Sequence, residues 1–82
     1  MNNDLIEPIR RAMVEEINSN PGAREALEAA YGQVWDTTEL TEAFKVEGFL
    51  APFVSVTRKS DGAQGALVFQ HSPRFYYGFT EG

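Results

Sequence analysis

Cysteine is absent from this 82-residue sequence, and histidine occurs once, as His71. Without cysteine there can be no disulfide framework, no thiolate zinc site and no cysteine nucleophile. A metal ion would need histidine, aspartate or glutamate ligands, and no spacing of these residues predicts such a site. The sequence therefore predicts a protein that works without a metal or a cofactor.

Long apolar runs are also absent. The longest, residues 49–54, contains Pro52 and is far too short for a membrane-spanning helix. The opening residues Met1-Asn2-Asn3-Asp4 have neither the basic nor the apolar part of a secretory signal. We therefore expect a cytoplasmic protein that does not enter a membrane.

Basic residues are scarce: 7 Lys and Arg stand against 12 Asp and Glu, and the formal net charge is −5. Ten of the acidic residues lie within residues 1–47, so this half of the chain should repel nucleic acid at long range. The 43% hydrophobic and 23% charged content is typical of one ordinary globular domain spanning 1–82. So small a domain has a small core, and self-association would add stability.

Apolar residues at three- and four-residue spacing predict two helices in the first half of the chain. The first covers residues 5–18 and begins after Asp4, which has the character of a capping residue. The second covers residues 21–31, with Asn20 as its expected cap and Gly32 as its end.

A short third helix is predicted after Trp35. Asp36 and Glu39 have the spacing of a capping box, and Leu40 and Phe44 give one apolar stripe. An apolar residue just before a cap often packs against the first turn, so Trp35 is expected to be a packing residue and not a platform for a ligand.

Beyond residue 45 the apolar period changes to two, and β-branched and aromatic residues become frequent, as in strands. Glycines between the first two alternating runs and Ser72-Pro73 after the second predict tight turns. The predicted strands are 53–59, 66–71 and 74–79, with a further strand at 46–51.

These elements predict an α+β domain in which two or three N-terminal helices pack on a C-terminal antiparallel meander of three to four strands. The helical part is residues 4–44 and the β part residues 46–80. On the last strand, alternation places Arg74 and Tyr76 on the face away from the helices. The strand residues expected under the helices are Val54, Val56, Leu67, Phe69, Phe75, Tyr77 and Phe79.

The C-terminal half also carries a pattern of short motifs that resembles small uncharacterised proteins of marine phages and bacteria. The resemblance implies a bacterium or the bacterial host of a phage as the setting, and it implies no activity and no catalytic residue. The motifs are Asp36-Thr37, Glu39-Leu40, Phe44, Val46, Gly48-Phe49, Ala51-Pro52-Phe53-Val54, Arg58-Lys59-Ser60-Asp61-Gly62, Gly65 and Gln70-His71-Ser72-Pro73-Arg74-Phe75-Tyr76.

Two features resemble nucleic-acid-binding folds. The first predicted hairpin, residues 54–67, resembles the opening hairpin of Sm-like RNA-binding barrels, although too little chain follows for the remaining strands. The order of helix, short helix and hairpin resembles a winged helix, with Arg58 and Lys59 leading into the wing. The segment 39–47 would then be the recognition element, and its three glutamates would face phosphates.

These resemblances leave open a nucleic-acid-binding accessory protein. It would use Arg58, Lys59 and Arg74 to hold phosphates and Tyr76 to stack on bases.

Catalysis is the least favoured hypothesis. His71 is the only side chain whose ordinary pKa suits base catalysis near neutral pH, but no glycine elbow or spaced acid supports a triad with Ser72. Asp61-Gly62 resembles the start of a cation-binding loop, yet residues 63–65 supply no further carboxylate, so Asp61 is expected to shape a hairpin turn.

Our main hypothesis is a non-enzymatic interaction module that self-associates through its aromatic C-terminal sheet, as a homo-oligomer. It predicts that Tyr76→Asp should produce monomers. The residues expected on the interaction surface are Phe53, Arg58, Lys59, Gln70, Arg74 and Tyr76.

Overall fold

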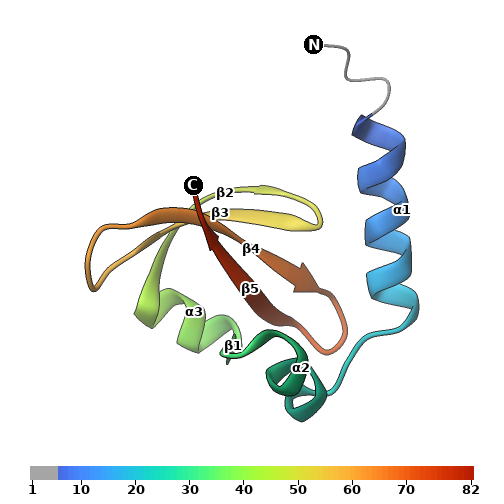
Figure 1. The fold of residues 1–82 in the computed structure, drawn as a ribbon, viewed down its shortest axis with the longest axis horizontal. Coiled ribbons are helices and arrows are strands. Elements are labelled where there is room, and N and C mark those ends of the chain that lie inside the picture. The colour runs from blue at the N-terminus through green and yellow to red at the C-terminus, as the bar shows by residue number, and fades with distance from the viewer. Residues whose placement is uncertain (1–5) are drawn as a thin grey trace.

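The chain folds into three helices and one five-stranded antiparallel sheet in a computed structural model, which describes residues 6–82 (Figure 1). The fold is α+β, as the sequence predicts. The predicted helix start at Asp4 lies outside the described residues. In chain order the elements are α1 (Ile6–Ser19), α2 (Arg24–Tyr31), β1 (Val34–Trp35), α3 (Thr37–Ala43), β2 (Phe44–Leu50), β3 (Phe53–Arg58), β4 (Gln64–Gln70) and β5 (Phe75–Glu81).

The strands lie in the order β1-β5-β4-β3-β2. Strands β2 to β5 follow one another across the sheet and form the predicted meander, and the segment 46–51 falls mostly in strand β2. Two predictions are wrong: the sheet has five strands instead of three or four, and α3 follows β1, so the helices do not all precede the sheet. Strand β1 is only two residues long, too short to show any alternation in the sequence.

The two faces of the sheet are covered by different helices. Leu40 of α3 packs with one set of strand residues, and Leu27 of α2 packs with another. We call the first the α3 face and the second the α2 face. The α3 face carries Val54, Val56, Leu67, Phe69 and Tyr76, and the α2 face carries Phe53, Val68, Phe75 and Tyr77.

The prediction that Phe75, Tyr77 and Phe79 share one face is wrong. Tyr77 packs on the α2 face, whereas Phe79 packs on the α3 face against Phe44, with ring centroids 5.3 Å apart. The strand changes phase at Gly78, which has φ 68° and lies where the β4–β5 register shifts. A positive φ favours glycine, and a bulge adds one residue to the count, so simple alternation cannot follow the strand through it.

Helix α3 begins with the predicted capping box. The Asp36 carboxylate accepts a hydrogen bond from the Glu39 backbone N–H at 2.7 Å, and the Glu39 carboxylate accepts one from the Asp36 N–H at 2.9 Å. Trp35 packs edge-on against Phe44, with ring centroids 5.1 Å apart. The predicted packing role of Trp35 is therefore confirmed.

Helix α2 begins later than predicted, at Arg24 instead of near residue 21. The buried side chain of Gln70 binds Gly22 just before the helix, since it accepts a hydrogen bond from the Gly22 N–H at 3.0 Å and donates one to the Gly22 carbonyl at 2.9 Å. This contact joins residues 48 apart in sequence, so the local pattern around Asn20 could not predict it. Gly32 ends the helix with φ 85°, as expected.

Helix α1 stands beside one end of the sheet, next to the turns that join β2 to β3 and β4 to β5 (Figure 1). The Asn18 side chain accepts a hydrogen bond from the His71 backbone N–H at 3.0 Å. None of the residues of α1 is buried, and Ile9 remains 61% exposed. The amphipathic stripe of this helix is thus only partly covered by the rest of the chain.

Candidate interaction surface

The six residues predicted to form one surface do not come together. Arg58 ends β3 and Lys59 follows it, whereas Gln70 and Arg74 lie at the turn between β4 and β5. Because neighbouring strands are antiparallel, these two turns lie at opposite ends of the sheet. Strand β3 has 6 residues, which at about 3.3 Å per residue separates its ends by roughly 20 Å.

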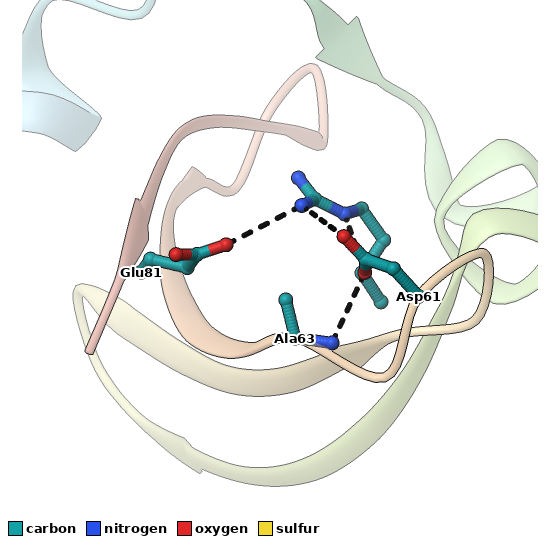
Figure 2. A network of polar contacts seen from close by, with 4 residues as sticks. Asp61, Ala63 and Glu81 are labelled. Atoms are coloured by element: carbon teal, nitrogen blue, oxygen red, sulfur yellow. Dashed lines mark hydrogen bonds and ion pairs between the residues drawn. The ribbon is translucent and has the colours of Figure 1, made fainter.

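Arg58 binds carboxylates of its own chain (Figure 2). Its guanidinium donates to both oxygens of Asp61, at 3.0 and 2.7 Å, and reaches Glu81 at 3.4 Å. The Asp61 carboxylate also accepts from the Ala63 N–H at 3.0 Å. The hydrogen bonds from Arg58 and the Ala63 N–H lower the pKa of Asp61 to about 2.

This network fastens the β3–β4 turn to the end of β5. The Arg58 guanidinium carbon lies 5.0 Å from the centroid of the Phe79 ring, within the distance for a cation–π contact. The Gly62 N–H donates to the Arg58 carbonyl at 2.7 Å, which closes the turn. The predicted role of Asp61 in a hairpin turn is thus confirmed, and Arg58 is engaged within the fold.

Lys59 ties the sheet to α3. Its Nζ donates to the Thr41 carbonyl at 2.7 Å, and its backbone N–H donates to the Ala43 carbonyl at 2.9 Å. The first of these bonds lies near the C-terminal end of α3, where carbonyls lack partners within the helix and a cation is favourable.

Arg74 lies in a second cluster at the opposite end of the sheet. Its guanidinium nitrogens lie 3.0 Å from His71 Nδ1 and 3.3 Å from the Tyr76 hydroxyl oxygen, and its carbon lies 5.0 Å from the Phe69 centroid. The Arg74 Nε is buried and has no hydrogen-bond partner among residues 6–82. His71 is thus a neighbour of a cation, whereas a catalytic histidine base is usually oriented by a carboxylate.

Gln70 and Tyr76 are interior residues, so their predicted place on an open face is wrong. Gln70 is 1% exposed and Tyr76 is 2% exposed. Tyr76 packs beside Phe69 on the α3 face. Helix α3 covers this face, so Tyr76 is buried. The substitution Tyr76→Asp would therefore damage the core, and it cannot test self-association.

Phe53 alone among the six lies on an open part of the sheet. It belongs to a row that crosses the α2 face, with Leu50 on one side and Val68 on the other. Phe53 and Val68 are half-buried, and Leu50 at the outer end of the row is 59% exposed.

The largest exposed apolar side chains of the sheet belong to β2. Phe49 and Leu50 are 56% and 59% exposed, although Phe49 also meets Phe69 edge-on at 5.5 Å. Strand β2 is the last strand of the sheet, and no described strand pairs with its outer edge. The sequence predicts a strand at 46–51 but no site on it, and it places residue 44 in the helical part, so the edge formed by the first residues of β2 was missed. The alternation of apolar and charged residues in Phe44-Lys45-Val46-Glu47 is the signal that predicts a strand there.

A cleft of about 500 Å³ lies between α1, α2 and the α2 face. Its apolar lining includes Met13 and Ile17 of α1, Leu27 of α2, and Val68 and Tyr77 of the sheet. Burial and the neighbouring Tyr31 raise the pKa of Tyr77, so its hydroxyl is neutral at physiological pH. The cleft offers apolar contact to a small group, and Glu16, Asn20 and Gln70 are the polar residues of its lining.

Within the described part of the chain, no helix is long and apolar enough to cross a membrane. Residues 6–82 also contain no cluster of three or more histidine, aspartate and glutamate side chains placed to hold a metal ion. Comparison with known proteins found no matching family model, no matching curated protein and no matching solved structure.

Proposed function

We propose that this protein is a non-enzymatic interaction module that associates with copies of itself through its sheet. The observation that carries the proposal is the state of β2: an edge strand of 7 residues that ends in two large, mostly exposed apolar side chains, Phe49 and Leu50. An unpaired edge with exposed apolar residues is a surface that another chain can extend. A second copy covers such a surface in many small proteins, because self-contact enlarges a small core.

The other two hypotheses have weaker support. Arg58 binds Asp61 and Glu81, Lys59 binds α3, and Arg74 lies at the far end of the sheet, so these cations do not form one phosphate-binding track. A small enzyme centred on His71 has the guanidinium of Arg74 as the described polar side chain beside its ring, whereas a catalytic histidine base is usually oriented by a carboxylate.

The proposal is tested by the solution mass of the double variant Phe49→Ser/Leu50→Ser. We expect the wild type to form a stable oligomer and the variant to be monomeric, because the variant loses apolar contact at β2. The matched control is Ile9→Ser, which removes a similarly exposed apolar side chain from α1. Circular dichroism should show that all three proteins are folded. An oligomer that survives the double variant and dissociates in the control would move the interaction surface to α1.

A further inference from the structure

The backbone of β2 offers hydrogen-bonding groups on its outer side. The Lys59 N–H donates to the Ala43 carbonyl, and the register pairs Phe44 with Arg58, Lys45 with Thr57 and Val46 with Val56. In an antiparallel pair, hydrogen-bonded positions alternate with positions whose groups point away. Ala43 and Lys45 therefore face β3, and the N–H and C=O of Phe44 and Val46 point outward from the sheet.

Two exposed side chains of opposite charge flank Val46. Lys45 and Glu47 both extend on the α2 face, since Lys45 is opposite Thr57 in the register and the Glu47 carboxylate accepts a hydrogen bond from the Thr57 hydroxyl at 2.9 Å. Edge strands that must not pair often carry charged side chains, especially lysine. On β2 the charges are opposite in sign and equidistant from Val46, so the strand is complementary to an antiparallel copy of itself.

We propose that two copies of this chain join antiparallel along β2, about a two-fold axis at Val46, to form one continuous ten-stranded sheet. This inference rests on the proposed self-association and adds its geometry. At the axis, the N–H and C=O of each Val46 bond to those of the other copy. On either side, Lys45 of one copy lies opposite Glu47 of the second copy, at a non-hydrogen-bonded position where side chains approach closely.

The axis is perpendicular to the sheet, so each face continues into the same face of the second copy. Val46 is half-buried beside the core of the α3 face, and the two Val46 side chains meet there. Phe49 lies on this face too, on the far side of the β-bulge from Val46, where the regular register of the two copies no longer applies.

The β-bulge after Val46 limits the extent of the pairing. The register with β3 shifts between Val46 and Gly48, so the regular edge is short and the backbone alone contributes few hydrogen bonds. The pairs of Lys45 with Glu47 of the second copy therefore determine much of the register in which the two strands pair. Glu47 has one carboxylate oxygen engaged with Thr57, which leaves the other oxygen for Lys45 of the second copy.

Charge reversal tests this geometry. Lys45→Glu and Glu47→Lys each place like charges opposite each other twice in the dimer, so each variant should raise the dimer dissociation constant about tenfold at low salt. The double variant Lys45→Glu/Glu47→Lys restores opposite charges at both places, so it should return the dissociation constant to near the wild-type value. Both positions are exposed, and circular dichroism should show that each variant folds.

Matched controls separate this effect from net charge. Arg11→Glu on α1 and Glu25→Lys on α2 change the net charge by the same amounts at exposed positions, and they should leave the dissociation constant unchanged. The β2 geometry would be wrong if the single charge reversals left the dissociation constant unchanged, or if the double variant did not return it to near the wild-type value. Either result would leave self-association itself intact. A wild type that stays monomeric at every concentration would overturn both proposals.

Discussion

The ion pair between Arg58 and Asp61 explains at atomic detail why the β3–β4 turn has its shape. The turn residue Asp61 binds the last residue of β3 and the Ala63 N–H, and the same guanidinium reaches Glu81 on β5. A carboxylate held by two guanidinium hydrogen bonds and one backbone N–H is stabilised in its charged form. The turn therefore depends on an ionised Asp61.

The stability of the fold should depend on pH through this carboxylate. The pKa of Asp61 falls from 3.8 to about 2 on folding, so the ion pair stabilises the folded state above about pH 4, and this contribution disappears as the pH falls toward 2. Asp61→Asn should lower the free energy of unfolding at neutral pH and lose this difference from the wild type near pH 2. Urea titrations of the wild type and of Asp61→Asn at a series of pH values measure the two free energies of unfolding.

The control for this prediction is Glu25→Gln, at an exposed position of α2. The free energy of unfolding of this control should differ little from that of the wild type at every pH. If the stability difference between wild type and Asp61→Asn stayed constant from neutral pH to pH 2, the ion pair would not be the source of the effect.

Individual roles were predictable from the sequence where they depend on neighbours along the chain. The hairpin role of Asp61 follows from the glycine beside it, and the packing role of Trp35 follows from the cap after it. The burial of Gln70 and Tyr76 was not predictable, because Gln70 bonds to Gly22, 48 positions away, and the burial of Tyr76 depends on which helix covers its face. The six-residue surface failed for a different reason: in the predicted antiparallel meander, Arg58 and Lys59 already lie at the opposite end of the strands from Gln70 and Arg74.

Among the elements, α3 has the most complete local explanation. Both hydrogen bonds of its capping box form. The Glu39 carboxylate also forms an ion pair with the guanidinium of Arg24 in α2, at 2.8 Å. The same guanidinium donates to the Val34 carbonyl at 2.9 Å. One arginine thus joins α2, β1 and the start of α3.

Replacing the cap should measurably weaken the fold. Asp36→Ala removes the acceptor for the Glu39 N–H and should lower the free energy of unfolding by about 1 kcal/mol, as measured by urea denaturation. Thr38→Ala, an exposed position in the first turn of the same helix, is the matched control and should change stability by less than about half as much. Equal losses in the two variants would contradict a specific role for the capping box.

Long elements with a clear period were predictable, and short or non-local ones were not. The meander and the three helices follow from periodicity and turn residues. Strand β1 has two residues and exists because it pairs with β5 more than 40 positions away. The start of α2 is set by Gln70 on Gly22, which again joins distant parts of the chain.

Across the whole molecule, the acidic residues are concentrated in the first part of the sequence. Ten of the 12 acidic residues lie in residues 1–47, and a net charge of −5 would favour the solubility of the proposed assembly. Among residues 6–82, the large apolar side chains that stay exposed lie on α1 (Ile6 and Ile9), on α2 (Tyr31) and on β2 (Phe49 and Leu50). The edge of β2 has the added property that its charges are complementary to a second copy.

The most direct test is the solution mass of the wild-type protein, measured by light scattering over a concentration series at low and moderate salt. We expect a mass that rises with concentration to twice that of the chain. Association should be weaker at the higher salt, because salt screens the charge pairs at β2. A mass equal to that of one chain at every concentration and salt would contradict self-association, and with it the proposed function.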